Sequence, residues 1–166
     1  MKKIFAMMLV AILAMSASAF AATYTYDDIT FDYNEDFYEI SMEDHTDDED
    51  LVILTDKTEG GITIHLADLK DGETFPTADE LAKTVGAEVE TMEEWGNFKN
   101  VLCYDYTAED GYYEIVFIAP VYDDDGEVDD ILTVKVGGMP IEDDDTAMEC
   151  SDMASEVVDT LKIIGD

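Results

Sequence analysis

Apolar and polar residues alternate along much of the chain beyond residue 22, and this period of two is typical of β-strands with one buried face. The clearest example is GITIHLADL (61–69), in which Ile62, Ile64 and Leu66 point to one side of the strand. Further strands are predicted at 29–41 (a strand pair or one bent strand), 51–55, 100–108, 112–121 and 131–136. Residues 24–30 are expected to form an extended lead-in, and residues 42–50 a polar loop. Short turns rich in glycine and acids separate several of these segments, so neighbouring strands are expected to pair as antiparallel hairpins.

In two segments the spacing of apolar residues changes from the period of a strand to that of a helix. In TADELAKTVGAEV (77–89), Thr77 is the expected N-cap, and Glu80 three residues later completes a capping box. A second helix is predicted from about Asp144 to Ile163, where apolar residues recur every three or four positions. The order is therefore strands, helix, strands, helix, without a repeated βαβ unit. This order predicts an α+β fold, an antiparallel sheet with two main helices packed on it.

The chain begins with the pattern of a secretory signal peptide. Lys2 and Lys3 precede an apolar stretch at 4–15, and two Ala-x-Ala cleavage motifs follow at 17–19 and 19–21. We therefore expect a signal peptide at 1–21 and a single domain at 22–166, exported to the periplasm or the extracellular space. No later apolar run approaches the roughly 20 residues needed to cross a bilayer, so no membrane insertion is expected after cleavage.

The chain is strongly acidic, with 42 Asp and Glu against 8 Lys and Arg and a formal net charge of −34. Nucleic acids and anionic membranes are excluded as natural partners, because binding them requires basic residues that neutralise phosphates. An envelope or extracellular protein, or cations, are the expected partners. The many aromatic residues and the apolar periodicity argue that the chain is ordered despite its charge.

Chemistry-bearing motifs are few. An EF-hand centred on Gly126 is excluded, because its first and last ligand positions would be Val121 and Leu132. A looser Ca²⁺ site remains an alternative to a solvated hairpin loop, which we favour. Its ligands would be Asp123, Asp125, Glu127 and Asp129.

The two cysteines predicted to remain after export, Cys103 and Cys150, are consistent with one disulfide in an oxidising compartment or with two buried thiols. The two histidines, His45 and His65, are isolated in the sequence and are interpreted as surface residues rather than zinc ligands.

No catalytic arrangement stands out. There is no nucleophile elbow and no glycine-rich phosphate loop, and with so many acids a pair of carboxylates carries little information. We expect an exported, non-enzymatic accessory or binding domain without a cofactor. The first alternative is a low-affinity Ca²⁺ or divalent-cation binder, and a carboxylate-based hydrolase comes last.

Three stretches together resemble PsbP/Mog1-like domains. They are the opening ITFDYNEDFYEI, the hairpin EEWGNFKNVLCYDYTAEDGYYEIVFIAPV around a Gly turn, and the final DTLKII at 159–164. The resemblance implies an α/β/α sandwich, in which an antiparallel sheet of about six strands is flanked by the two main helices. It implies no catalytic residue, since members of this family are mostly accessory or binding proteins.

Overall fold

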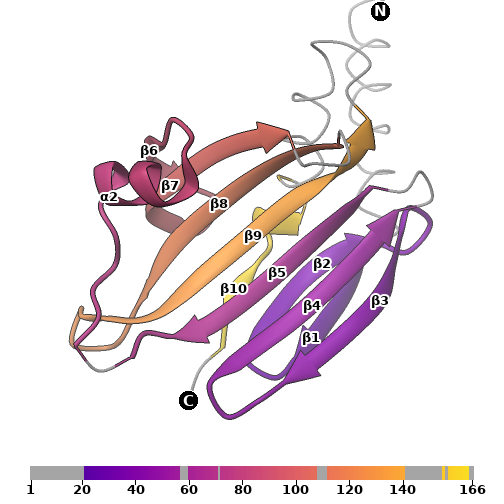
Figure 1. Ribbon diagram of the computed structural model, residues 1–166. Coiled ribbons are helices and arrows are strands. Elements are labelled where there is room, and N and C mark those ends of the chain that lie inside the picture. Colours follow the sequence, from indigo (N-terminus) through magenta and orange to yellow (C-terminus); the bar gives the residue numbers. More distant parts are fainter. Residues whose placement is uncertain are drawn as a thin grey trace, which may run out of the picture.

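A computed structural model of the chain describes residues 21–56, 60–70, 72–107, 112–140, 155 and 157–164, with only the backbone described for Ala21 and 138–140. Its main feature is a seven-stranded antiparallel sheet in the order β3-β4-β5-β9-β8-β7-β6 (Figure 1). The strands are β3 (Tyr38–His45), β4 (Glu49–Asp56), β5 (Gly61–Asp68), β6 (Glu90–Trp95), β7 (Phe98–Thr107), β8 (Tyr112–Tyr122) and β9 (Val128–Pro140).

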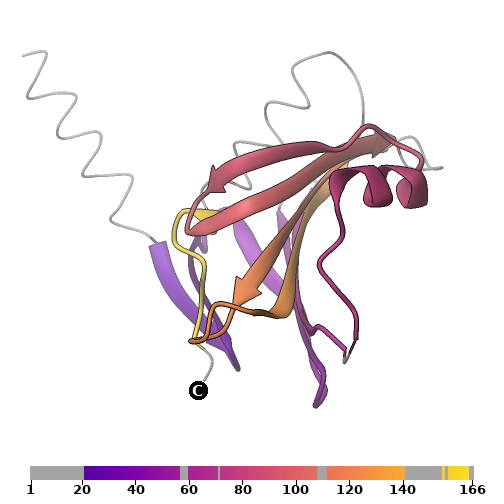
Figure 2. The same ribbon diagram turned by 90° about the vertical axis from the view of Figure 1, so that its left-hand side faces the viewer.

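A second, three-stranded antiparallel sheet has the order β1-β2-β10. It consists of β1 (Ala21–Tyr26), β2 (Ile29–Asn34) and β10 (Lys162–Ile163). The start and the end of the domain therefore meet in one sheet. Figures 1 and 2 show this small sheet lying across one face of the large sheet.

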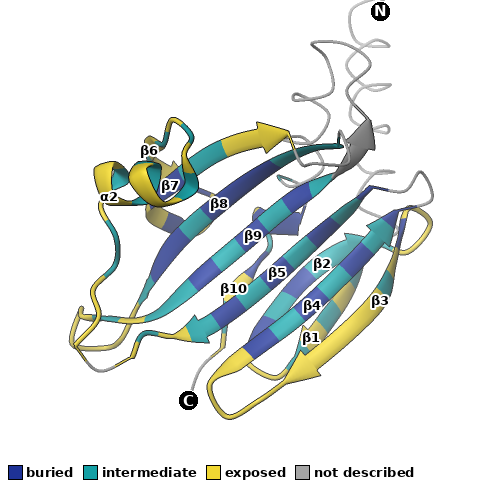
Figure 3. Cartoon of the chain, viewed as in Figure 1, coloured by how far each residue is buried: buried dark blue, intermediate teal, exposed yellow. Residues whose placement is uncertain are grey.

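The core lies between the two sheets. Buried and partly exposed residues alternate along β4, β5 and β9, so that one face of each strand is fully buried (Figure 3). Ile29 and Phe31 of β2 belong to the same core cluster as these buried residues. Trp95 and Phe117 stack in this core with ring centroids 3.8 Å apart. Burial of this apolar surface is the main force that holds the sheets together.

The helix predicted at 77–89 is confirmed in its position and its start. It is α2 (Ala78–Val85), and Thr77 and Glu80 form the complete capping box. The helix is shorter than predicted because Gly86 takes a left-handed conformation and ends it. It lies on the face of the large sheet opposite to the small sheet (Figures 1 and 2).

The predicted fold class is wrong. The described chain has a seven-stranded and a three-stranded sheet and one α-helix of more than two turns, not a six-stranded sheet flanked by two main helices. The α/β/α sandwich implied by the PsbP/Mog1-like resemblance is wrong for the same reason. The antiparallel pairing and most predicted strands are confirmed.

The end of the chain accounts for most of this correction. Only Ser155, Val157 and Val158 are helical among the described residues of the predicted helix, and residues 144–154 lie outside them. Lys162 and Ile163 then pair with Thr30 and Ile29 as strand β10. Among the described residues, Val157, Val158 and Leu161 are buried, and the chain leaves the helical conformation after Val158. Pairing with β2 also satisfies backbone groups that would otherwise lie at an open sheet edge.

Three further differences concern polar segments. The predicted lead-in contains strand β1, and the predicted loop at 42–50 is mostly strand, because β3 continues to His45 and β4 begins at Glu49. Strand β6 was not predicted, because its residues are mostly exposed and lack alternation. The predicted signal peptide lies outside the described residues except for Ala21. Among the helices that the structure describes, none is long and apolar enough to cross a membrane.

Candidate functional site

Acidic residues from both sheets converge at one end of the molecule. We call this group the acidic junction, and its members are Asp27, Asp28, His45, Asp50, Asp68 and Asp130. The turn between β1 and β2 supplies the first two residues, and the hairpin of β3 and β4 supplies His45 and Asp50. The last two face each other on the paired ends of β5 and β9. Most of these residues line a small cavity of about 60 Å³.

Strand register brings these residues together. His45 is the cross-strand partner of Asp50, and Asp50 is in turn paired with Leu66, two residues before Asp68. The β1–β2 turn reaches the same place because the backbone N–H of Asp28 donates to Asp50 Oδ2 at 3.4 Å. The backbone N–H of Ile164 donates to the Asp28 carbonyl at 2.8 Å, so the end of the chain also supports this turn.

Two carboxylates compete for one nitrogen of His45. Its Nδ1 lies 2.7 Å from Oδ2 of Asp27 and 2.6 Å from Oδ1 of Asp50. A ring nitrogen carries at most one hydrogen, so it cannot form a well-directed hydrogen bond to both oxygens at once. The two carboxylates also repel each other, and Asp50 is only 4% exposed. The arrangement is therefore stabilised by positive charge between the three side chains.

The pKa values of His45 and Asp130 are shifted because several carboxylates lie close together in the junction. The hydrogen bond that His45 donates to the Asp50 carboxylate raises the pKa of His45, and the charge of Asp27 acts in the same direction. Burial, followed by the charges of Asp129 and Asp68, raises the pKa of Asp130 to about 6. Both shifts favour the state in which the junction has taken up positive charge.

A divalent cation would supply that charge. Asp27 Oδ2, His45 Nδ1 and Asp50 Oδ1 lie within 4.8 Å of one another and form the one group of three such ligand atoms among the described residues. A donor set of two carboxylates and an imidazole suits Zn²⁺ or Mn²⁺ better than Ca²⁺. Two ligands about 2.1 Å from one metal lie roughly 3 Å apart, so the side chains would have to separate by a few tenths of an ångström.

The four acids predicted as metal ligands do not belong to this group of three, but Asp123, Asp125 and Asp129 line a cavity of about 470 Å³ together with Asp130 of the junction. Asp123, Asp125 and Glu127 are exposed in the connection between β8 and β9, and Asp129 is exposed at the start of β9. Asp123 Oδ1 accepts a hydrogen bond from the backbone N–H of Glu127 at 2.9 Å, so this carboxylate holds the turn. Gly126 completes the turn with a φ of +82°. A cation site in this loop stays a prediction.

The predicted disulfide is not tested. Cys103 lies on β7 with a free thiol and is partly buried, whereas Cys150 lies outside the described residues. Burial, with the nearby charges of Glu90 and Asp105, raises the pKa of Cys103 to about 11.

Sequence reasoning missed the three residues that the structure groups. His45 was interpreted as an isolated surface residue, because the loop predicted around it gave it no fixed neighbour. A hairpin interpretation of 42–50 would have placed His45 opposite Asp50. No local signal connects Asp27 to this pair, since it belongs to the other sheet. The second histidine does lie at the surface, with His65 Nε2 2.9 Å from Glu49 Oε2.

No protein-family model matches the chain, and no curated protein matches it. The relation to PsbP/Mog1-like domains stays a prediction, and the function has to be argued from the geometry of the site.

Proposed function

We propose that the protein is an exported, non-enzymatic binding domain that takes up a divalent cation at the acidic junction. The approach of Asp27 and Asp50 to the same nitrogen of His45, at 2.7 and 2.6 Å, is the observation that carries this proposal. A cation between these atoms would remove the repulsion between the carboxylates and the competition for one proton. No lysine is among the described residues that line the adjoining cavity, so the protein itself offers little other counter-charge there.

The cation would also connect the two sheets. Asp27 belongs to the turn of the small sheet, whereas His45 and Asp50 belong to the large sheet. Binding would therefore stabilise the packing of one sheet on the other, and the folded state would gain stability by mass action. In this proposal the loaded protein acts as an accessory domain that presents its acidic surface to an envelope or extracellular partner.

A carboxylate-based hydrolase is the less favoured reading of the same residues. Asp68 and Asp130 are cross-strand partners at the paired ends of β5 and β9, and the raised pKa of Asp130 is a property found in general acids. The cavity that Asp68 and Asp130 both line, however, measures about 60 Å³, far below the roughly 300 Å³ of the smallest ordinary ligand pockets. Asp130 also lines a neighbouring cavity of about 470 Å³, but Asp68 does not, so the two carboxylates do not act together there. An ion with one or two waters fits this volume, but an organic substrate does not.

Calorimetric titration of metal-free protein with MnCl₂, ZnCl₂ and CaCl₂ tests the proposal. We expect saturable binding of one Mn²⁺ or Zn²⁺ per chain. Asp50→Asn and His45→Gln should each weaken the affinity at least tenfold, since each removes one of three protein ligands. The half-exposed His45 provides the variant that is expected to leave the fold intact.

Asp125→Asn is the matched control, because Asp125 is exposed in the acidic β8–β9 loop and lies outside the junction. It should bind as the unmodified protein does. Loss of binding in Asp125→Asn alone would instead assign the cation to that loop. Equal, unsaturable heats in all variants would mean that cations only screen the surface charge, and the proposal would be wrong.

A further inference from the structure

Strands β7 and β8 separate at one end of the large sheet. Their pairing runs from Thr107 opposite Tyr113 to Leu102 opposite Ile118 and stops there. Beyond this point β7 continues beside β6 as far as Phe98, and β8 continues beside β9 as far as Tyr122. The sheet therefore opens into a wedge between two strands that each keep their other neighbour.

Two residues account for the separation. Pro120 has no N–H to donate, and the β7–β8 ladder ends two residues before it, whereas the β8–β9 ladder continues past it. On the other strand, Asn100 takes a φ of +56°, which turns the chain out of the extended conformation. The Asn100 side chain then donates to the hydroxyl of Tyr122 across the wedge at 3.1 Å.

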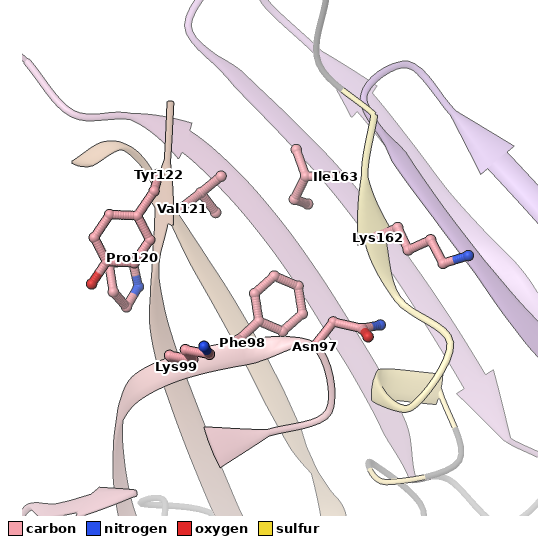
Figure 4. A pocket seen from close by; sticks show the side chains of 8 residues that line it. All are labelled: Asn97, Phe98, Lys99, Pro120, Val121, Tyr122, Lys162 and Ile163. Carbon is pink, nitrogen blue, oxygen red and sulfur yellow. The ribbon is translucent and has the colours of Figure 1, made fainter. Parts of the chain in front are cut away.

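The end of the chain closes one side of this wedge. Asn97 Nδ2, at the tip of the β6–β7 hairpin, donates to the carbonyl of the buried Leu161 at 2.9 Å. Next to it, Gly96 lies so close to Val158 that an added Cβ would be 2.7 Å from that residue. These contacts hold β10 opposite the opening, and Figure 4 shows Ile163 between Val121 and the β10 ribbon.

The result is a pocket of about 390 Å³ with an apolar lining and basic residues, which lies within the usual range for small-molecule sites. Five of its residues are apolar or aromatic, and the other three are Asn97, Lys99 and Lys162. The lining residues are Asn97, Phe98, Lys99, Pro120, Val121, Tyr122, Lys162 and Ile163 (Figure 4).

The charge of this pocket is opposite to that of the protein. None of its described lining residues is acidic, although the chain has 42 acids, and two of its 8 basic residues are here. Neither Lys99 nor Lys162 forms an ion pair within the described part of the chain. The Lys162 ammonium points away from Phe98 in Figure 4, and Lys99 and Lys162 lie on opposite sides of the opening.

We infer that this pocket binds a small amphipathic carboxylate, such as a medium-chain or aryl-substituted alkanoate. Its apolar body would lie against Phe98, Val121 and Ile163, and its carboxylate would pair with Lys99 at the rim. The site shares no residue with the cavity of the acidic junction, so this inference does not depend on cation binding. The lining offers two lysines and no carboxylate to a negatively charged ligand, whereas the neighbouring cavity, which shares Val121, Tyr122 and Ile163 with it, is lined by five aspartates and would repel such a ligand.

Octanoate is the probe, and 1-octanol is the uncharged control of the same length. Calorimetry should give saturable binding of octanoate that is at least tenfold tighter than that of octanol, because only the acid can pair with a lysine. In the series butyrate, hexanoate, octanoate, each CH₂ should tighten binding about threefold as apolar surface is buried. Amide NMR shifts should centre on Asn97, Lys99, Asn100 and Ile163.

Lys99→Met removes the charge and keeps an apolar stem, and it should weaken octanoate binding about tenfold without changing the melting temperature. Lys83→Met is the matched control, because Lys83 is an exposed lysine of α2 that does not line the pocket. Equal affinity for octanoate and octanol would overturn the inference. So would equal losses in the two lysine variants, or an affinity that does not change with chain length.

Discussion

The imidazole Nδ1 of His45 lies 2.6 Å from Oδ1 of Asp50, a carboxylate that is almost completely removed from solvent. His45 itself is half exposed, so the pair links the surface to the core at the point where the two sheets meet. A buried carboxylate needs a partner of opposite charge, and here the partner is an imidazole that a second carboxylate also approaches. We therefore expect this site to respond to protons and, in the proposed function, to a divalent cation.

The stability of the cation-free protein should fall between about pH 4 and pH 7. The pKa of Asp130 is raised to about 6 from an ordinary value of 3.8, so its protonated form is favoured in the folded state. The stabilisation is therefore complete below about pH 3.8 and is lost as the pH rises through about 6. Melting temperatures measured in EDTA across this range check the prediction.

Asp130→Asn, which resembles the protonated acid, should flatten this pH dependence and stabilise the protein at pH 8. Asp36→Asn, in the exposed turn between β2 and β3, is the control and should leave the slope unchanged. If melting temperatures of the unmodified protein were constant from about pH 4 to pH 7, the crowding of carboxylates around Asp130 would not exist in solution.

Gly96→Ala should destabilise the protein by about 3 kcal/mol in urea unfolding. Gly96 has a φ of +57°, which costs a residue with a Cβ about 1 kcal/mol. The new Cβ would also lie 2.7 Å from both the Cγ1 and the carbonyl oxygen of Val158. Overpacking of this kind typically costs about 1–3 kcal/mol.

Gly126→Ala separates the cost of the positive φ from the cost of overpacking. Gly126 also has a positive φ, +82°, but no atom lies within 4 Å of the position of its added Cβ. This variant should lose only about 1 kcal/mol. Equal losses in the two variants would show that the β6–β7 turn does not pack against Val158.

Thr160→Val tests the strand that replaces the end of the predicted helix. The backbone N–H of Asp32 donates to Thr160 Oγ1 at 2.8 Å, which attaches β2 to the residues before β10. Valine keeps the shape and removes the acceptor, so unfolding should require about 1–2 kcal/mol less free energy. Thr25→Val removes an exposed hydroxyl contact with Thr30 and should change stability by less than about 0.5 kcal/mol. An unchanged stability in Thr160→Val would contradict the attachment.

Cys103 should react slowly with iodoacetamide at pH 7.5 in the folded protein. Its pKa is raised from 9.0 to about 11, mainly by burial, so about a hundredfold less reactive thiolate is present than in a free cysteine. Peptide mapping by mass spectrometry separates Cys103 from Cys150, and the same reaction in urea is the control for intrinsic reactivity. Rapid labelling of folded Cys103 would mean that β7 is more open than described.

Local sequence patterns predicted the secondary structure correctly wherever it depends on residues that are close in the sequence. The alternation in 61–69 predicted strand β5, and Thr77 with Glu80 predicted the start of α2, because both signals depend on residues close in sequence. The prediction was wrong at the end of the chain. There the spacing of Val157 and Leu161 suits a helix that continues to Ile163, but the helical conformation ends after Val158, and Lys162 and Ile163 pair with β2.

The sequence by itself determined that the chain forms antiparallel strands around an apolar core and that its surface is acidic. Only the tertiary structure decided which polar residues meet, because Asp27, His45 and Asp50 come from two different sheets and Lys99 and Lys162 from opposite sides of one opening. The regular spacing of apolar residues along the chain predicts which side chains are buried. The meeting of charged side chains depends on strand register and on packing between distant segments, and no local period encodes these.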